Sequence, residues 1–280
     1  MQQIKEARRL RALLKAQSGA GKSIGFVPTM GNLHEGHLSL VRRARALTDF
    51  VVVSIFVNPL QFDRQDDLDA YPRTLEADAR LLERAGVGLL YAPDPDDFYP
   101  DEADRLTRID VPVVTERLEG AARPGHFSGV ATVVARLFNL VQPDIAVFGE
   151  KDYQQLRMIE KMVVDLGMPV TIMSEPTVRE ADGLAMSSRN SRLSEAEREK
   201  APRLYEVLKK VAEVVRLGGR DFRKIESKGA ELLRSDGFRV DYLEICRATD
   251  LRPATERDTE LIVLAAAWLG NTRLIDNLRV

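Results

Sequence analysis

Short runs of β-branched and other apolar residues alternate with helix-like segments over the first two thirds of the chain. Five such runs predict strands, at residues 24–27, 50–56, 89–92, 145–148 and 170–173. Between them, apolar residues recur at spacings of three and four, which predicts helices over residues 38–47, 75–85, 130–141 and 153–166. Strands that are apolar along their whole length are typical of a sheet buried on both faces. The pattern predicts an α/β fold: a Rossmann-like, doubly wound parallel sheet, with ligands beyond the carboxyl ends of its strands.

The pattern changes after about Glu175. Ser194, with Glu197 three residues later, is typical of a helix start, and the long charged segment that follows predicts a helix to Leu217. A glycine pair then ends it. A second helix is predicted near residues 222–234, and strands at 240–246, 261–267 and 272–275. We therefore expect two domains: a Rossmann-like ligand-binding domain at residues 1–176, and a smaller C-terminal α+β lid domain at residues 177–280.

Composition narrows the functional classes. The 280 residues are 44% hydrophobic and 30% charged, as in ordinary globular proteins, and a formal net charge of −2 gives no basic field for nucleic acid. The lone Cys246 excludes an intramolecular disulfide and a cysteine-based zinc cluster, and is expected in the core. No apolar run approaches the ~18 residues of a spanning helix, and no signal-type core opens the chain. We expect a soluble cytoplasmic protein with no membrane partner.

The most informative segment is Phe26-Val27-Pro28-Thr29-Met30-Gly31-Asn32-Leu33-His34-Glu35-Gly36-His37-Leu38. It leaves the first predicted strand and enters a helix at about His37, so two imidazoles lie at a helix N-terminus. The unpaired N–H groups there favour anions, and two imidazoles can bind phosphate oxygens and stabilise charge in a phosphoryl transfer. Gly36 lets the backbone approach the phosphates closely. The alternative is two unrelated loop histidines, although the whole chain has only three.

Two other motifs fit poorly. The spacing of three between His34 and His37 differs from the spacing of four in zinc-protease helices. Residues 19–23, Gly-Ala-Gly-Lys-Ser, resemble the end of a phosphate-binding P-loop, but Ala16 stands where that motif needs glycine. The segment also precedes a strand instead of following one. We expect a turn there.

Two later segments add phosphate-binding chemistry. Residues 148–155 follow a predicted strand, and Lys151 could neutralise phosphate while Gly149 allows close approach. Asp152 could instead cap the next helix. In residues 183–190, two serines next to Arg189 could clamp a triphosphate, since a guanidinium offers forked donors. A polar interdomain loop is the alternative for that segment.

Six blocks of the chain carry a resemblance: residues 28–37, 57–62, 71–74, 123–130, 148–155 and 186–190. Taken together, they resemble the pantothenate synthetases (pantoate–β-alanine ligases), within the HxGH nucleotidyltransferase superfamily. The resemblance runs in order from about residue 24 to residue 193. HxGH alone is shared with other nucleotidyltransferases and class I aminoacyl-tRNA synthetases, whereas the other blocks are more particular. Asn32 stands where the family often has a small residue.

The resemblance implies ATP-dependent condensation of pantoate with β-alanine through a pantoyl adenylate, releasing pyrophosphate and AMP, with Mg²⁺ accompanying ATP and a homodimeric state. It implies catalytic roles for His34, His37, Lys151 and Arg189, with His37 the preferred proton donor or charge stabiliser. The implied ATP-binding residues are Met30, Gly31, His34, Gly36, His37, Gly149, Glu150, Lys151, Asp152, Val178, Met186, Ser187, Ser188 and Arg189. The implied substrate-binding residues are Pro28, Thr29, Gln61 and Gln155, the two glutamines holding pantoate.

Some assignments stay open. Arg123 and His126 could fix a loop or contact substrate. Glu76, Asp78 and Glu116 are possible magnesium partners, but no metal ligand is assigned, because Mg²⁺ on ATP needs few protein ligands.

Rival functions remain. They are another adenylyl transferase with a phosphate acceptor, for which neutral glutamines in the acceptor pocket would be unsuited, and a non-catalytic nucleotide sensor, which would not need His37 or Lys151. An aminoacyl-tRNA synthetase would need room for an anticodon domain.

Overall fold

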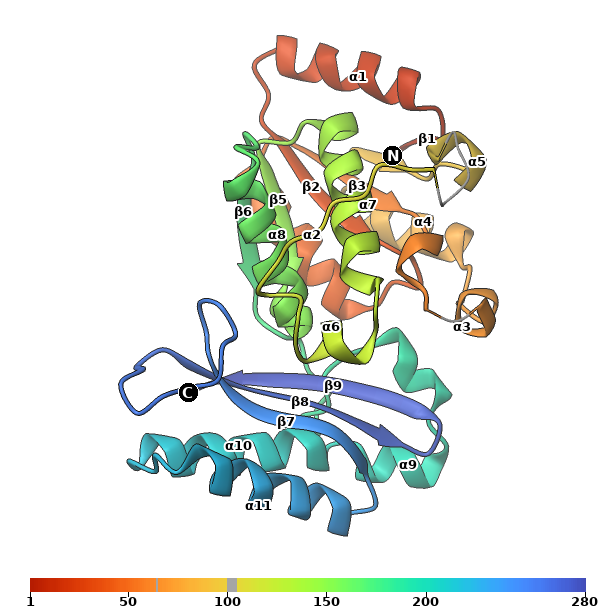
Figure 1. Cartoon of the computed structure of the whole chain (residues 1–280). Coiled ribbons are helices and arrows are strands. Elements are labelled where there is room, and N and C mark those ends of the chain that lie inside the picture. Colours follow the sequence, from red (N-terminus) through yellow and green to blue (C-terminus); the bar gives the residue numbers. More distant parts are fainter. Residues whose placement is uncertain (64, 100–104) are drawn as a thin grey trace. The chain divides into compact units, whose positions relative to one another are not determined.

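The computed structural model describes residues 1–63, 65–99 and 105–280 of the chain. These residues form two compact units. Unit 1 comprises residues 1–150 and 158–176, and unit 2 comprises residues 151–157 and 177–280. Residues 151–157, which the sequence analysis placed in the first domain, therefore cluster with unit 2. Figure 1 shows the elements of both units in the order of the chain.

Unit 1 is built on a six-stranded sheet with all neighbouring strands parallel, in the order β1-β4-β3-β2-β5-β6. The strands are β1 (Gln2–Ile4), β2 (Ile24–Thr29), β3 (Phe50–Ile55), β4 (Leu89–Tyr91), β5 (Ile145–Gly149) and β6 (Thr171–Glu175). The longer helices are α1 (Ala7–Gly19), α2 (Glu35–Leu47), α4 (Leu75–Arg84) and α7 (His126–Val141). The shorter ones are η1 (Pro59–Gln61), α3 (Gln65–Asp69), α5 (Pro95–Phe98) and α6 (Glu119–Ala122). Two elements cross the boundary between the units, η2 (Glu150–Asp152) and α8 (Tyr153–Asp165).

Helices cover both faces of this sheet. Successive strand residues point to opposite faces. Val27 of β2 belongs to a cluster with Val41 of α2 and Leu82 of α4, while its neighbour Phe26 lies against Phe138 of α7, with ring centroids 6.3 Å apart. Burial on both faces explains the continuous apolar runs, and it confirms the predicted Rossmann-like sheet.

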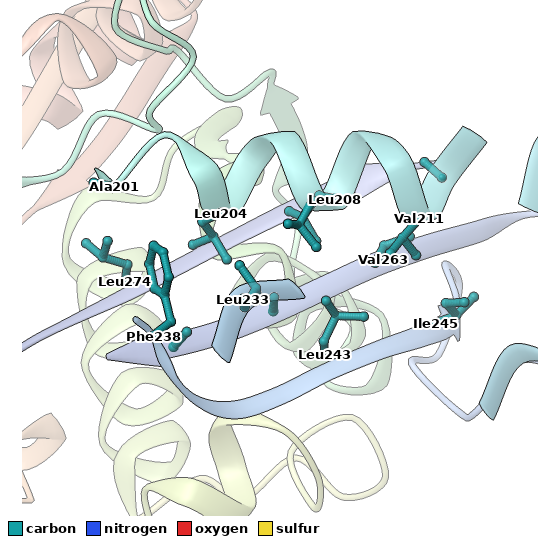
Figure 2. Close-up of a cluster of buried hydrophobic side chains, with 14 of the residues drawn as sticks. Ala201, Leu204, Leu208, Val211, Leu233, Phe238, Leu243, Ile245, Val263 and Leu274 are labelled. Atoms are coloured by element: carbon teal, nitrogen blue, oxygen red, sulfur yellow. The ribbon is translucent and has the colours of Figure 1, made fainter. Parts of the chain in front are cut away.

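Unit 2 is a three-stranded antiparallel sheet covered by helices. Its strands are β7 (Arg239–Arg247), β8 (Leu261–Leu269) and β9 (Thr272–Arg279), in the order β7-β8-β9. Its helices are η3 (Ser188–Arg192), α9 (Glu195–Lys200), α10 (Arg203–Arg216) and α11 (Phe222–Ser235). Figure 2 shows the core, where apolar side chains of α10, such as Leu204 and Leu208, pack towards those of the strands, such as Leu243 and Val263. The predicted α+β organisation is confirmed.

The structure also corrects several elements. The capping box at Ser194 is present, but the predicted helix to Leu217 is two helices, because α9 ends at Lys200 and α10 begins at Arg203. Pro202, which separates them, has no N–H to donate to the preceding turn. Strand β1 and helix α1 were not predicted. The turn expected at residues 19–23 is confirmed, since α1 ends at Gly19 and β2 follows.

Within the described ranges, no helix has both the length and the apolar character needed to cross a membrane.

Candidate active site

The turn between β2 and α2 carries the two histidines. It leaves β2 after Thr29, and α2 begins at Glu35, so the helix starts earlier than the predicted His37. Gly31 has a φ of +82°, a left-handed conformation that most side chains disfavour, and a Cβ there would lie 3.1 Å from atoms of Asp78 and Ile55. The turn itself therefore requires this glycine.

A buried carboxylate holds the same turn. Asp78 of α4, only 2% exposed, accepts the backbone N–H groups of Asn32 and Leu33, each at 2.9 Å, and the hydroxyl of Thr74 at 3.0 Å. Asn32 has a φ of +50°, so its left-handed backbone depends on such support. From the sequence, Asp78 was only a possible magnesium partner. Its oxygens instead stabilise the histidine turn.

Each histidine ring is bound to the backbone beside it. His34 is the N-cap of α2, and its Nδ1 accepts the N–H of Gly36 at 3.2 Å, while Nδ1 of His37 accepts the N–H of His34 at 3.3 Å. The ring centroids lie 4.1 Å apart. A ring nitrogen that accepts a hydrogen bond carries no proton, so each neutral imidazole carries its proton on Nε2. The pair thus offers two Nε2–H donors.

This arrangement suits an anion. Helix α2 has 13 residues, and the positive end of its dipole lies at this turn. Two N–H donors on adjacent rings add directional hydrogen bonds to that field. Such donors stabilise charge that develops on phosphoryl oxygens without accepting or losing a proton themselves.

Gln61 is oriented by a buried asparagine. Asn58, 1% exposed, donates from Nδ2 to Oε1 of Gln61 at 3.0 Å and to the carbonyl of Gly129 at 3.1 Å. Its Oδ1 accepts the hydroxyl of Tyr99 at 2.9 Å, and burial raises the pKa of that phenol, which keeps it a donor. The amide oxygen of Gln61 is thus occupied, and the other group of this amide, Nε2, is a hydrogen-bond donor.

The backbone of Gln61 is held by the two residues whose role the sequence left open. His126 Nδ1 lies 2.8 Å and Arg123 Nη2 lies 3.3 Å from the Gln61 carbonyl oxygen, and Arg123 Nη1 lies 3.2 Å from His126 Nε2. A carbonyl only accepts and a guanidinium only donates, so His126 carries its proton on Nδ1. Its tautomer is the opposite of that of His34 and His37. Of the two readings, the contacts of Arg123 and His126 show loop fixing.

A glycine lets these segments meet. A Cβ on Gly129 of α7 would lie 2.2 Å from the backbone oxygen of Leu60 and 2.8 Å from the nitrogen of Gln61. No side chain fits at such distances, and the obstruction is backbone, which cannot rotate away. Two of the blocks that carry the family resemblance, residues 57–62 and 123–130, therefore pack together through this glycine.

The predicted residues around the end of β5 differ in their surroundings. Gly149 has open space, since the nearest atom to a Cβ there would be a Leu40 methyl at 3.9 Å. Glu150 accepts the hydroxyl of Ser174 at 3.0 Å, so it is tied to β6. Lys151 is largely covered, and its Nζ lies 4.0 Å from the carboxylate of Asp152, which directly precedes α8.

The segment from Val178 to Arg192 folds into a hairpin followed by η3. Met186 donates its N–H to the carbonyl of Val178 at 3.0 Å, so these two predicted residues are neighbours. Ser187 is the N-cap of η3 and accepts the N–H of Arg189 at 3.3 Å. Asn190 donates from its amide to the carbonyl of Ala185 at 3.0 Å. The loop that carries both serines and Arg189 is thus ordered by its own hydrogen bonds.

The predicted site residues divide between the two units. The structure brings His34 into contact with His37 and Val178 into contact with Met186. Unit 1 contains Pro28, Thr29, Met30, Gly31, His34, Gly36, His37, Gln61, Gly149 and Glu150, and unit 2 contains Lys151, Asp152, Gln155, Val178, Met186, Ser187, Ser188 and Arg189. Among the described residues, no group of three or more His, Cys, Asp or Glu side chains is placed to hold a metal ion.

Sequence reasoning missed Asn58 and Asp78. The Asn-Pro pair was a readable signal for Asn58, because asparagine followed by proline is typical of a helix start. Nothing in the sequence marked this role of Asp78, since it lies in an ordinary charged helix and the two backbone groups that it holds are more than 40 residues away.

Comparisons with known proteins agree with this picture. The family model of pantoate–β-alanine ligase matches residues 2–279. A pantothenate synthetase of Azotobacter vinelandii is 58% identical over 99% of this chain and 98% of its own length. The crystal structure of pantothenate synthetase from Thermus thermophilus has a TM-score of 0.92 at 50% identity, covering 99% of each chain. A pantoate–β-alanine ligase from Francisella tularensis, complexed with β,γ ATP and β-alanine, has a TM-score of 0.83 at 34% identity, covering 100% of this chain and 97% of its own.

The chain therefore belongs to the pantoate–β-alanine ligase family. It is an ATP-dependent ligase that condenses pantoate with β-alanine to form pantothenate.

Proposed function

We propose that the condensation proceeds in two steps in which His34 and His37 stabilise the phosphoryl group of ATP. In the first step, a pantoate carboxylate oxygen attacks the α-phosphorus, the bond to the β-phosphate oxygen breaks, and pyrophosphate leaves. In the second step, the β-alanine amine attacks the acyl carbon of pantoyl adenylate, AMP leaves, and the amine gives up a proton. The observation that carries this proposal is the pair of Nε2–H donors at the start of α2.

The chemistry fits these donors. A carboxylate is already an anionic nucleophile, so the first step needs no general base, and the residues contribute positioning and charge stabilisation. Two neutral N–H donors stabilise the negative charge on the α-phosphoryl oxygens without having to release a proton. Their orientation is set beforehand by the hydrogen bonds of the two Nδ1 atoms, so no reorganisation is needed as the charge develops.

ATP and β-alanine are ligands of the Francisella tularensis relative, and we assign both to this chain. We assign ATP contacts to residues of each unit: the turn from Met30 to His37, Gly149 and Glu150 in unit 1, and Lys151, Asp152, Val178 and residues 186–189 in unit 2. Lys151 and Arg189 supply the positive charge for the phosphates. The lid role of residues 177–280 stays a prediction.

We assign pantoate to Gln61 and Gln155, with Pro28 and Thr29 at the end of β2 beside the histidine turn. Support for Gln61 comes from the fixed direction of its amide, whose Nε2 can donate to the carboxylate or a hydroxyl of pantoate. Gln155 lies in the first turn of α8.

Mg²⁺ bound to the ATP phosphates would neutralise part of their charge. Two of the three protein carboxylates considered for it have other partners: Asp78 accepts three hydrogen bonds, and Glu116 accepts the N–H of Val113 at 2.9 Å. We therefore assign no protein ligand. Mg²⁺ that is held by phosphates and water needs few protein ligands.

The test is the release of pyrophosphate and AMP by the purified chain with MgATP, pantoate and β-alanine, omitting each component in turn. We expect pantoate-dependent exchange of pyrophosphate into ATP without β-alanine, and steady AMP release only when β-alanine is added. AMP release that requires pantoate and β-alanine together, with no pantoate-dependent exchange of pyrophosphate into ATP, would contradict the adenylate intermediate.

A homodimer also stays a prediction, and a monomer mass by sedimentation would contradict it.

A further inference from the structure

A buried ion pair lies inside unit 2, and neither of its two residues has an assigned catalytic or binding role. Asp276 of β9 has a side chain that is 1% exposed, and it accepts two hydrogen bonds from the guanidinium of Arg179, at 2.7 and 2.9 Å. The guanidinium carbon lies 3.5 Å from the ring centroid of Tyr205. Burying a charge pair is costly, and apolar residues of similar volume often stabilise a core as well. The pair is therefore not explained by stability alone.

Arg179 connects this ion pair to the loop that carries Arg189. Arg179 also donates to the carbonyl of Gly183 at 3.1 Å, and it forms a β-bridge with Ala185 across the hairpin. The N–H of Glu180 donates to the carbonyl of Leu184 at 2.8 Å in the same hairpin. Arg179 therefore fixes both strands of the hairpin from which Met186 to Arg189 emerge.

The ion pair is also connected to Lys151. Asn277, the next residue of β9, donates its N–H to Oδ1 of Asp276 at 2.8 Å, and its carbonyl lies 3.3 Å from Arg179. The side-chain amide of Asn277 donates to the main-chain carbonyl of Lys151 at 2.9 Å. One connected set of hydrogen bonds thus joins the two segments of unit 2 to which we assign phosphate contacts.

We propose that Arg179, Asp276 and Asn277, here called the β9 clasp, are positioning residues that place Lys151 and the loop of Arg189 for the ATP phosphates. The inference rests on the proposed function, since it takes Lys151 and Arg189 as phosphate contacts. A fork of two hydrogen bonds fixes direction as well as distance, which a single ion pair would not. The clasp acts through the main chain of Lys151 and the hairpin, and it touches no reacting atom.

The proposal predicts an effect on one half-reaction only. Pyrophosphate is present while the adenylate forms and has left before the amide forms. A misplaced Lys151 or Arg189 should therefore slow pantoate-dependent exchange of pyrophosphate into ATP, and it should leave the aminolysis of supplied pantoyl adenylate nearly unchanged. A general loss of folding would slow both.

The first variant is Asn277→Ala, which removes the amide that donates to Lys151. We expect kcat/KM for ATP in the exchange reaction to fall about tenfold, the loss expected for one well-formed hydrogen bond, and aminolysis to fall less than about twofold. Asp276→Asn, which breaks the fork, should give a larger loss in the same direction. Should Asp276→Asn fail to fold, Asn277→Ala still decides the matter.

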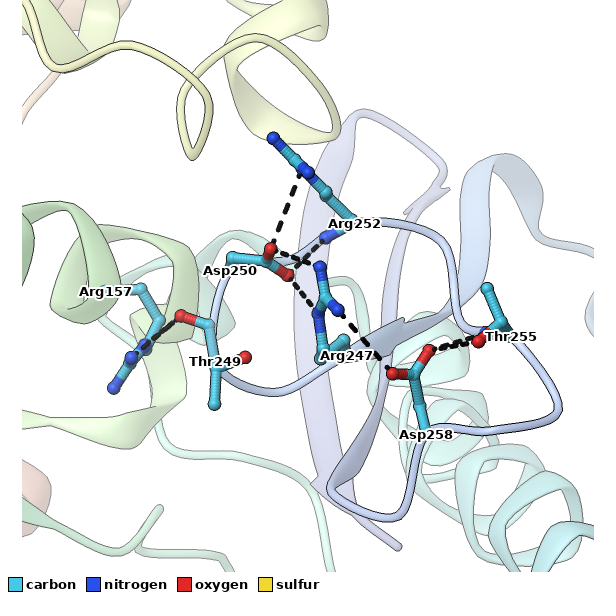
Figure 3. Close-up of polar contacts among 7 residues, drawn as sticks. All are labelled: Arg157, Arg247, Thr249, Asp250, Arg252, Thr255 and Asp258. Atoms are coloured by element: carbon cyan, nitrogen blue, oxygen red, sulfur yellow. Dashed lines mark hydrogen bonds and ion pairs between the residues drawn. The ribbon is translucent and has the colours of Figure 1, made fainter.

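A matched control lies in the same unit. Figure 3 shows a second forked pair, in which Arg247 donates to Asp250 at 2.8 and 2.5 Å on the loop between β7 and β8. The Asp250 side chain is 30% exposed, and Figure 3 shows its partners Arg247 and Arg252. Asp250→Asn should leave both half-reactions unchanged.

Three results would each overturn the proposal. Asn277→Ala could slow both half-reactions equally, it could slow neither, or Asp250→Asn could slow pyrophosphate exchange as much as Asn277→Ala does. Lys151→Met separates this from the proposed function. If Lys151→Met slows exchange and Asn277→Ala does not, the clasp fails alone. If Lys151→Met has no effect, the phosphate role of Lys151 fails, and the clasp inference falls with it.

Discussion

The rings of His34 and His37 accept hydrogen bonds from backbone N–H groups two and three residues away, whereas the main chain of Lys151 is held by a side chain 126 residues further along. The Arg179 fork similarly spans 97 residues. The first arrangement needs only the residues at the start of α2, although Asp78 of α4 also holds the turn before it. The second exists only when β9 has taken its place in the sheet.

This difference predicts which substitutions change activity alone and which also change the stability of the fold. A residue held by its own turn can be replaced with little effect on the rest of the fold. A residue held by a buried, distant ion pair is linked to the packing of its unit, because removing one partner leaves a buried charge, at a cost of about 3–5 kcal/mol. Substitutions at the histidines should therefore alter activity alone, and those at the β9 clasp should alter both.

The largest expected effect is at His37. His37→Ala should lower kcat by about 10²- to 10³-fold, as the loss of a single transition-state donor does, with a smaller change in KM for ATP. His37→Asn retains an acceptor near the position of Nδ1, and His37→Gln retains a donor near Nε2. Steady-state kinetics should rank Gln above Asn in activity, and denaturant unfolding should show changes below about 1 kcal/mol for both.

An equal loss of turnover and ATP affinity in His37→Ala would contradict the catalytic role. If His37→Asn were more active than His37→Gln, the reaction would need the hydrogen bond from the His34 N–H to Nδ1, and not the Nε2 donor. A large fall in unfolding free energy would remove the contrast between the two regions.

Gly129 tests whether a long-range contact also matters in unit 1, because it packs against Leu60, which is distant in the sequence. The Gly129→Ala variant places a methyl group against the backbone of Leu60, so the unfolding free energy should fall by about 1–3 kcal/mol, and KM for pantoate should rise because Gln61 shifts with Leu60. Chemical unfolding and steady-state kinetics measure both. Gly149→Ala is the matched control, since a Cβ there meets nothing closer than 3.9 Å.

Gly149→Ala should keep the stability of the parent protein. A rise in the KM of this variant for ATP would then mean that the added methyl group obstructs ATP, in agreement with the close approach that the sequence predicted. Unchanged stability in Gly129→Ala would contradict the role of that glycine in joining the two blocks.

The smallest expected effect is on the hairpin of unit 2. The hydrogen bond from Arg198, at 2.5 Å, lowers the pKa of Asp182 below its usual 3.8, and the N–H of Leu184 adds to this. A lowered pKa means that the folded state favours the charged carboxylate. Its contribution is therefore present above pH 3.8 and is lost as the pH falls through the lowered pKa.

Asp182→Asn should thus cost less than about 1 kcal/mol at neutral pH, since the pair is partly exposed. The difference between variant and parent should shrink as acid unfolding is followed below about pH 4. A difference that stays constant with pH would contradict the ionic contribution. A cost well above this range would make the hairpin as sensitive as the buried clasp.

Most of the fold was predictable because its signals are local. Continuous apolar runs identified five of the six strands of the parallel sheet, and the serine–glutamate pair identified the start of α9. The break at Pro202 was also local and was overlooked. Strand β1 has only three residues, too few for a pattern, and it forms because it can pair with β4.

The site was predictable to the same extent. His34, His37 and the loop of Arg189 stand out by residue type and spacing. Asp78 and the β9 clasp do not, because the role of each depends on partners far along the chain. The Asn-Pro pair marks Asn58 only as a helix start. The family resemblance supplied Gln61, but only the structure shows that Asn58, Arg123 and His126 fix it.

The most direct test of the account is the proton position on the chain's three histidines. A long-range ¹H–¹⁵N correlation spectrum near pH ~8, where unperturbed imidazoles are neutral, distinguishes the two tautomers, and His→Gln variants assign the signals. The account predicts Nε2–H for His34 and His37 and Nδ1–H for His126. A proton on Nδ1 of His34 or His37 would contradict the hydrogen bonds to α2 and remove the pair of Nε2 donors on which the proposed chemistry depends.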